Sequence, residues 1–329
     1  MDVLELTRQF RTAVPAPAPD SERAARRALV ARFDERPRRL RRGRPLFRVA
    51  IAVAVVAVAS ILAASGVIPG EPDGTSDALA GEVEEIAAAA AGQPALGVGA
   101  GEYMYTRSRE ADLATTNEGG HSWSVLVPVT REVWLATDGS GRIRERVGEP
   151  TFLSDADRAA WVAAGRPPLT ARESSDERFP AGALSGDRAR GLPTDPDALA
   201  RVIREQASGT DVPVDVEMFV IAGDLLRMPT TPPAVRAALY RVLSKVSGVE
   251  FVGKATDAAG RAGVALAIES DYSGALERHQ MIVDPDTGDL LAEETVLLRG
   301  AAHLQAKPGT VIGYAVYLAV AATNGIRRP

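Results

Sequence analysis

A long apolar run lies near the start of the chain, between a basic stretch and an acidic one. Residues 49–68 are 20 consecutive positions without a charged side chain, and Ser60 and Ser65 are their only polar side chains. Since an α-helix rises about 1.5 Å per residue, a run of this length spans the ~30 Å hydrocarbon core of a bilayer. The pattern predicts one transmembrane helix over residues 46–68.

Arginine is concentrated on only one side of this run. Residues 36–48 contain seven arginines, whereas residues 69–77 contain three acids and no base. Because an excess of Arg marks the cytoplasmic side of a span, the N-terminus is expected in the cytoplasm. The expected layout is a single-pass protein of the plasma membrane, with a basic cytoplasmic tail (1–45), the transmembrane helix (46–68), a linker (69–78) and an exported, extracellular domain (79–329).

A cleavable secretory signal is the alternative interpretation of the same run. Such a signal has a short basic head and an apolar stretch of about 7–15 residues before a small-residue cleavage site. Residues 63–65 would serve as that site, but the 45-residue head and the 20-residue run are both too long. We therefore favour an uncleaved anchor. The absence of cysteine excludes a lipoprotein.

Several segments beyond the anchor show helical patterns with recognisable ends. Residues 79–92 are rich in Ala, Glu and Ile, a composition that favours helix. Four more helices are expected from their start signals and apolar spacing. They begin after a Ser154 cap, after a Thr194 or Asp195 cap with Pro196 in the first turn, near Val214, and at Thr231–Pro232 with an end near Gly248.

Alternating apolar positions predict strands on either side of these helices. In residues 122–137 the odd positions from Val125 to Leu135 carry most of the apolar side chains, so this strand is expected to bury one face. The exported part is therefore expected to be an α+β domain, with an antiparallel sheet covered by helices. Its other expected strand features are a strand from Glu102, a turn at 138–141 before a return at 142–148 with its arginines outward, hairpins through 257–263 and 284–289, and a last strand at 311–322.

Charge is divided unequally between the two sides of the expected membrane. Residues 1–48 carry a net charge of +7, and since the whole chain carries −5, the remainder carries −12. A basic inner segment suits anionic membrane lipids, and an acidic exported part argues against nucleic acid as a partner. The lack of cysteine also excludes disulfides, thiolate metal sites and a cysteine nucleophile.

No motif in the chain points to catalysis or to a cofactor. Asp284–Asp289 has three acids in six residues but lacks the longer loop of a calcium site, and residues 138–141 form a turn between strands. The three histidines, His121, His279 and His303, share no metal-ligand spacing. We expect no enzyme and no cofactor, and the sequence nominates no catalytic, cofactor-binding or metal-binding residue.

The exported part contains the phrases WLATDGSGRIRER, LPTDPDALARVIR, PPAVRAALYRVLSKVSGVEFVG, TDAAGRAGVALAI and IVDPDTGDLLAEE. Together they resemble a family of uncharacterised actinobacterial single-pass membrane proteins, over nearly the whole chain. Members of that family are often encoded beside extracytoplasmic-function sigma factors, so the resemblance implies an anti-sigma-like role in signalling. It implies no functional residues, and the tail lacks the His/Cys cluster of zinc-type anti-sigma domains.

The order of a helix, antiparallel strands, covering helices and further strands also resembles the lipoprotein-localisation fold. That fold is a curved half-barrel sheet closed by helices, so the resemblance implies a curved antiparallel sheet in the exported domain. A shared fold does not by itself indicate a shared function.

These observations lead to two main hypotheses about function and to a weaker third one, a hydrolase, which a cleft with His279 or His303 beside an acid and a serine would favour. In the first, the exported domain is a sensor that binds an envelope ligand or protein, and residues 1–35, two short amphipathic helices, hold a cytoplasmic sigma factor. In the second, the exported domain is a lipid- or ligand-binding module and the tail only orients the anchor. An apolar cavity under the helices would favour a bound acyl chain, whereas a dry, filled core would favour protein binding.

Overall fold

The computed structural model describes residues 76–171, 173–184, 188–299 and 306–329. The expected cytoplasmic tail (1–45), the expected transmembrane helix (46–68) and most of the linker lie outside these ranges. Within the described residues, every helix is too short or too polar to cross a bilayer.

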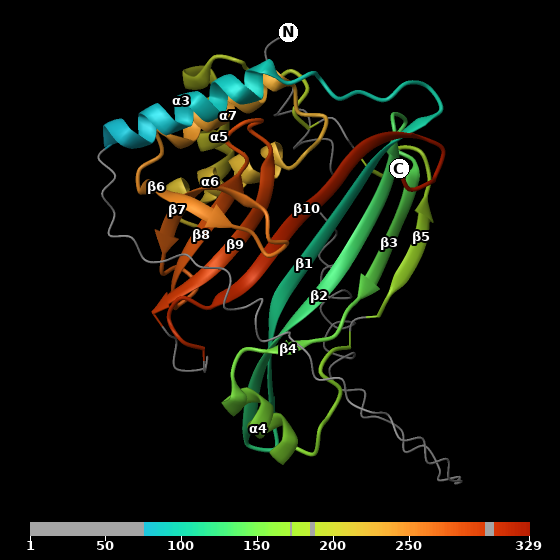
Figure 1. Cartoon of the computed structure of the whole chain (residues 1–329), viewed down its shortest axis with the longest axis vertical. Coiled ribbons are helices and arrows are strands. Elements are labelled where there is room, and N and C mark those ends of the chain that lie inside the picture. The colour runs from blue at the N-terminus through green and yellow to red at the C-terminus, as the bar shows by residue number, and fades with distance from the viewer. Residues whose placement is uncertain (1–75, 172, 185–187, 300–305) are drawn as a thin grey trace, which may run out of the picture. The chain divides into compact units, whose positions relative to one another are not determined.

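Ten strands of the described chain form one antiparallel sheet (Figure 1). Their order is β5-β3-β2-β1-β10-β9-β8-β7-β6, and β4 pairs with β2 outside this path. The last strand therefore lies between the first strand and the C-terminal hairpins, and joins two halves of the sheet. The strands are β1 (Glu102–Glu118), β2 (His121–Ala136), β3 (Gly141–Val147), β4 (Thr151–Phe152), β5 (Ser175–Phe179), β6 (Val249–Thr256), β7 (Ala262–Ser270), β8 (Leu276–Val283), β9 (Leu290–Arg299) and β10 (Val311–Asn324).

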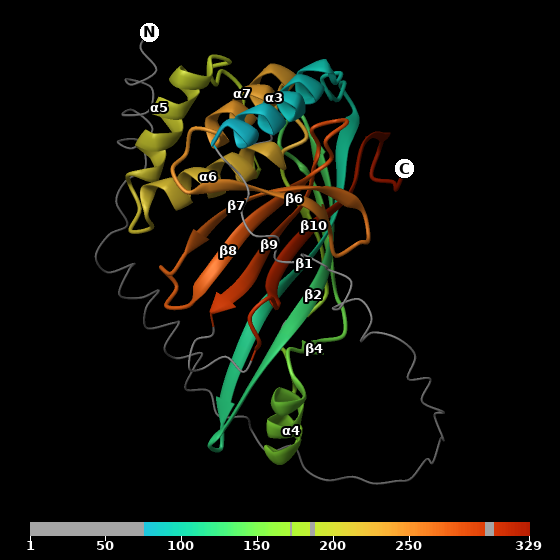
Figure 2. The ribbon, with the colours of Figure 1, turned by 60° about the vertical axis from the view of Figure 1, so that its left-hand side comes forward.

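The sheet is curved, as Figure 2 shows: the strands of its β6–β9 half and those of its β1–β2 half run in different directions. Both the α+β class and the curved antiparallel sheet are confirmed. The helices are α3 (Ser76–Gly92), α4 (Asp155–Ala163), α5 (Pro196–Ala207), α6 (Val214–Leu226) and α7 (Pro233–Leu243).

Two of the expected helix caps are present in the structure. Ser154 accepts a hydrogen bond from the backbone amide of Asp157 at the start of α4. Asp195, rather than Thr194, caps α5, and Pro196 occupies its first position. Both caps satisfy amides that have no partner within the helix.

Four helices cover one face of the β6–β9 half of the sheet. Helix α3 contacts β6, α6 contacts β7 and β9, and α7 packs among the other three helices. Leu239 and Leu243 of α7, Leu266 of β7 and Met281 of β8 are all 0% exposed. Burial of each such side chain contributes roughly 1.5–3 kcal/mol to stability. The space between these helices and the sheet is therefore filled by side chains.

Helix α4 packs separately, against the far end of the β1–β2 hairpin. Trp161 of α4 meets Phe152 of β4, with ring centroids 5.3 Å apart. The carboxylate of Asp157, which is 1% exposed, accepts a 2.7 Å hydrogen bond from the backbone amide of Ser124 in β2. This buried bond fixes α4 to the hairpin.

The expected burial of β2 is only half correct. Val125, Val127 and Val129 are buried as predicted, but beyond them the buried side chains are Glu132 and Trp134, on the opposite face. The C-terminal segment of the chain covers that face, since Trp134 Nε1 donates a 2.7 Å hydrogen bond to the carbonyl of Arg327. A contact between residues so distant in sequence leaves no trace in the periodicity of β2.

Two other expectations differ from the structure. The middle of the chain was expected to be helical between its hairpins, yet β5 is a strand there, polar and mostly exposed at the edge of the sheet. Such a strand has no apolar alternation by which it could be recognised. Helix α7 ends at Leu243, earlier than expected, and Gly248, with φ of 81°, leads into β6.

Candidate functional site

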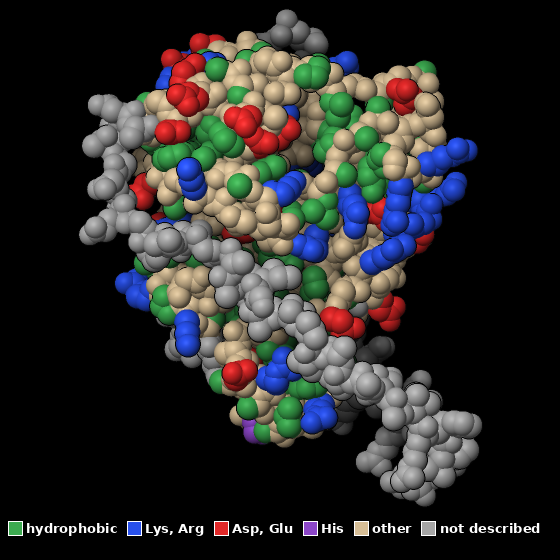
Figure 3. Space-filling model, viewed as in Figure 1, with side chains coloured by type: hydrophobic (Ala, Val, Ile, Leu, Met, Phe, Trp, Pro, Cys, Tyr) green, Lys and Arg blue, Asp and Glu red, His purple; other side chains and the backbone are tan. Residues whose placement is uncertain are grey.

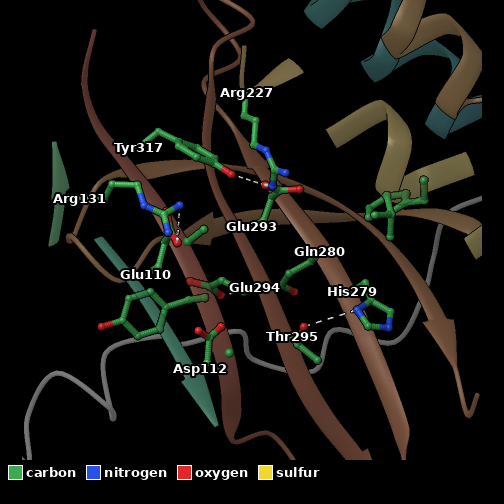
Figure 4. Close-up of a pocket in the computed structure, with 15 residues that line it drawn as sticks. Glu110, Asp112, Arg131, Arg227, His279, Gln280, Glu293, Glu294, Thr295 and Tyr317 are labelled. Atoms are coloured by element: carbon green, nitrogen blue, oxygen red, sulfur yellow. Dashed lines mark hydrogen bonds and ion pairs between the residues drawn. The ribbon is translucent and has the colours of Figure 1, made fainter. Parts of the chain in front are cut away.

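A polar cavity of about 460 Å³ opens where α6 meets β1, β2, β8, β9 and β10 (Figure 4). This volume lies within the range typical of small-molecule sites. Nine of its fifteen lining residues carry a charged or hydroxyl-bearing side chain. The lining residues are Glu110, Asp112, Arg131, Phe219, Val220, Arg227, His279, Gln280, Glu293, Glu294, Thr295, Gly313, Tyr314, Ala315 and Tyr317.

Glu293 of β9 is the centre of one charged group in the cavity. The hydroxyl of Tyr317 donates a hydrogen bond to its carboxylate, and the guanidinium of Arg227 lies 3.4 Å from the same oxygen. Burial, followed by the nearby carboxylate, raises the pKa of Tyr317, so the phenol keeps its proton and remains a donor. Gly223 of α6 allows this approach, because a Cβ there would collide with the Glu293 carboxylate.

Arg131 of β2 and Glu110 of β1 form a second charged group on the other side of the cavity. Their closest side-chain atoms are 3.3 Å apart, and Arg131 also donates a 2.8 Å hydrogen bond to Glu145 of β3. The antiparallel register of β1, β2 and β3 sets these residues on one face of the sheet. Guanidinium and carboxylate groups held in this way offer both donors and acceptors to a ligand.

His279 of β8 lies at a third side of the cavity, beside Thr295 of β9. The Thr295 hydroxyl and His279 Nδ1 are 3.4 Å apart. Burial lowers the pKa of His279, while the carboxylate of Glu277 acts in the opposite direction. The imidazole is therefore neutral near pH 7 and can both donate and accept a hydrogen bond.

Glu294 also lines the cavity, although it alternates with Glu293 along β9 and its position belongs to the other face of the strand. Its side chain is 4% exposed. One carboxylate oxygen accepts a 2.9 Å hydrogen bond from Gln280, and the other has no partner within the described structure. Burial raises the pKa of Glu294 to about 7, and the charge of Asp257 acts in the same direction.

The structure places the residues considered in the sequence at separate sites. His279 lines the cavity, His121 begins β2 at the tip of the long hairpin, and His303 lies outside the described residues. Among the described residues, no group of three or more His, Asp or Glu side chains is arranged to hold a metal ion. The acidic segment Asp284–Asp289 is the β8–β9 turn, and its Asp289 carboxylate pairs with Arg236 at 2.7 Å.

Sequence reasoning did not identify the cavity. Its polar residues come from five strands and from the C-terminal end of α6, and no two of the charged groups described above share a motif. The one available signal is the sequence LLAEETVLL, in which two glutamates interrupt an otherwise apolar strand. Charged residues inside such a strand require partners from neighbouring elements.

No protein-family model matches the chain, and no curated protein matches it. Among solved structures, a complex of Pseudomonas aeruginosa MucA and MucB aligns with 74% of this chain at 13% sequence identity and a TM-score of 0.22. The alignment spans about half the length of that protein, 56% of its chain. A TM-score this low does not establish a shared fold.

Proposed function

We propose that this chain is a single-pass, membrane-anchored regulator whose exported domain binds a small polar ligand in the cavity beside α6. Residues 1–35 would bind a cytoplasmic partner, which in the anti-sigma-like hypothesis is a sigma factor. The single observation that carries the binding role is the cavity wall, where two separate arginine–carboxylate groups and a neutral histidine surround one space.

A polar ligand suits this wall better than an acyl chain. Arg227, Glu293 and Tyr317 at one side, with Arg131 and Glu110 at the other, present fixed donors and acceptors. Side chains fill the space between the helices and the sheet, which leaves no room there for an acyl chain. A filled core was expected to favour a protein ligand over a lipid, and the cavity beside α6 is a separate space with polar walls. A hydroxyl-rich solute of about sugar size would satisfy the wall, with hydrogen bonds to charged groups that are stronger than those between neutral groups.

The chemistry of the cavity favours binding over catalysis. Its lining set contains no serine or lysine, and the chain contains no cysteine, so this wall offers no serine, lysine or cysteine nucleophile. Glu293 and Glu110 are each engaged by an arginine, which suits recognition rather than proton transfer. We therefore propose that the domain is not an enzyme.

The regulatory half of the proposal rests on the sequence. A basic tail, an uncharged run of 20 residues and an acidic remainder predict a protein with two unlike parts on the two sides of a plasma membrane. The second candidate is an extracytoplasmic ligand-binding module without a cytoplasmic role, in which the tail only sets topology.

Ligand binding is tested with the full chain in neutral detergent and a panel of sugars, amino sugars and amino acids, with thermal stability as the signal. A compound that stabilises the wild-type protein should bind Glu293→Gln and Arg131→Gln at least tenfold more weakly, because each loses a charge-assisted contact. Each variant should therefore need at least tenfold more compound for the same rise in melting temperature. Glu250→Gln, an exposed carboxylate on β6, is the matched control and should respond as the wild type does. Equal responses in all four proteins would place the binding site elsewhere.

The regulatory role is tested by affinity purification of the full chain and of residues 36–329 from native membranes. A sigma factor that co-purifies only with the intact tail would support the regulator. If no partner depends on the tail, the second candidate, a binding module without signalling, is the correct one.

A further inference from the structure

Arginine side chains gather on the helix-free face of the β1–β2–β3–β5 half of the sheet. The strand register sets them in transverse rows, because Arg107 lies opposite Glu132, Glu132 opposite Arg144, and Arg142 opposite both Trp134 and Arg178. Figure 3 shows basic side chains clustered over the region of β3 and β5. We call this surface the arginine face; its arginines are Arg107, Arg142, Arg144, Arg146, Arg178 and Arg328.

The two acids of the arginine face are already paired. Glu132 accepts hydrogen bonds of 2.6 and 2.7 Å from Arg328 of the C-terminal segment. Asp176 accepts hydrogen bonds from Arg142 at 2.6 and 2.5 Å and from Arg144 at 3.1 Å. These bonds keep both carboxylates ionised, and each carboxylate charge is compensated by arginines of the same face. Two acids cannot neutralise six arginines, so the face has an excess of positive charge.

Three of the arginines supply this excess directly. Arg107, Arg146 and Arg178 are on the same face and have no carboxylate partner among the described residues. Arg146 and Arg178 are exposed. Their guanidinium groups can therefore accept a new anionic partner without breaking an existing ion pair.

Buried aromatic side chains support part of the arginine face. Trp134 is 2% exposed, and the guanidinium carbons of Arg142 and Arg144 lie 5.8 and 5.9 Å from the centroid of its ring. Tyr105 stacks beside the same ring at 5.1 Å. Cation–π contacts and ion pairs thus hold Arg142 and Arg144 in place beside the unpaired arginines.

We propose that the arginine face docks onto the anionic phospholipid headgroups of the membrane that anchors the chain. Neighbouring strands lie about 4.8 Å apart, so the guanidinium groups form a closely spaced array that can bind phosphate oxygens in pairs. Helix α3 begins at Ser76, and the seven residues between it and residue 68 reach at most roughly 25 Å from the bilayer. The tether therefore keeps the domain close to the headgroups.

Charge on the rest of the domain favours this orientation. The chain beyond residue 48 carries a net charge of −12, so it is acidic as a whole and the arginine face is the exception. An anionic surface repels the acidic regions and attracts the arginine face, so the domain has a preferred orientation. The inference rests on the membrane anchor of the proposed function, but not on the ligand cavity.

The experiment uses the full chain in phosphatidylcholine nanodiscs, mixed with vesicles of phosphatidylcholine alone or with phosphatidylglycerol. In every protein compared, the seven arginines of residues 36–48 are changed to Gln, because the basic tail would otherwise bind the anionic vesicles by itself. Co-sedimentation should require phosphatidylglycerol and should weaken as salt is raised, since salt screens exposed charges. The triple variant Arg107→Gln, Arg146→Gln and Arg178→Gln should bind on the order of a hundredfold more weakly. The control variant Arg201→Gln, Arg204→Gln and Lys254→Gln loses the same charge from other exposed positions and should bind as the wild type does.

Three outcomes would overturn the inference. One is equal binding by the wild type and the triple variant, and another is an equal loss in the control variant, which would show that only net charge matters. The third is capture of polyglutamate but not of phosphatidylglycerol vesicles, which would make an acidic polypeptide the partner. Failure of the chain to enter neutral nanodiscs would refute the anchor separately, and the soluble chain would then be tested on the same vesicles.

Discussion

Replacement of Glu294 by Gln should make the protein more stable at neutral and alkaline pH. Glu294 is a carboxyl group buried at 4% exposure, with one oxygen lacking a hydrogen-bond partner in the described structure. Burial raises its pKa from 4.5 to about 7. Glutamine keeps the shape of the side chain and never ionises, so the variant avoids the cost of a buried charge.

The size of the effect follows from linkage between folding and proton binding. A difference of about 2.5 pH units between the folded and unfolded pKa corresponds to roughly 3 kcal/mol, at about 1.4 kcal/mol per unit. Below pH 4.5 the carboxyl group is protonated in both states and has no cost. As the pH rises towards 7, the unfolded chain loses this proton more readily, and the folded state becomes progressively less favoured.

Urea unfolding of the full chain in neutral detergent, followed by tryptophan fluorescence, measures this difference. Trp123 and Trp134 are 1% and 2% exposed, so unfolding changes their surroundings. The variant should gain stability over the wild type steadily between pH 5 and pH 7, and by about 3 kcal/mol at pH 8. Glu250→Gln, which removes an exposed carboxylate from β6, should show no such pH-dependent gain.

A constant difference between Glu294→Gln and wild type across pH 5 to 8 would refute the reasoning. It would mean that the carboxyl group titrates alike in folded and unfolded chains. A variant that is less stable at every pH would show instead that the introduced side-chain amide packs less well against Gln280 than the carboxyl group of Glu294 does.

Two further predictions concern stability. Asp157→Ala should cost about 2 kcal/mol in urea unfolding, because it removes the acceptor of a buried β2 amide, whereas Asp155→Ala in the exposed first turn of α4 should cost no more than about 0.5 kcal/mol. Gly288→Ala should lower the melting temperature far more than Gly260→Ala: both glycines have positive φ, but a Cβ at Gly288 would lie 2.6 Å from that of Ala90 in α3, while Gly260 has open space. Equal losses within either pair would contradict the packing argument.

Local signals in the sequence were sufficient for most of the secondary structure. Ser154 and Asp195 cap helices as predicted, because a cap needs only a side-chain oxygen and the next few amides. The hairpin turns at 257–261 and 284–289 follow from their Asp and Gly content. The long 121–136 strand was also recognisable, since its first half alternates with period two.

The partners of buried polar groups could not be predicted in the same way. Glu132 and Trp134 are buried because residues 327 and 328, nearly 200 positions later, fold across them. Likewise Glu293 meets Arg227 and Tyr317 from different elements. Sequence periodicity reports which positions along one element are apolar, and it contains no information about which distant segment covers them.

The sequence by itself determined the α+β class, the antiparallel hairpins, the charge division and the prediction of a single anchor. Each depends on composition or on patterns within about 20 residues. Only the tertiary structure decided where charge is concentrated. The chain beyond residue 48 has a net charge of −12 and nevertheless presents an arginine face, and a polar cavity assembles from five strands and a helix. The reason is that strand register and sheet curvature, rather than sequence order, determine which charged groups become neighbours.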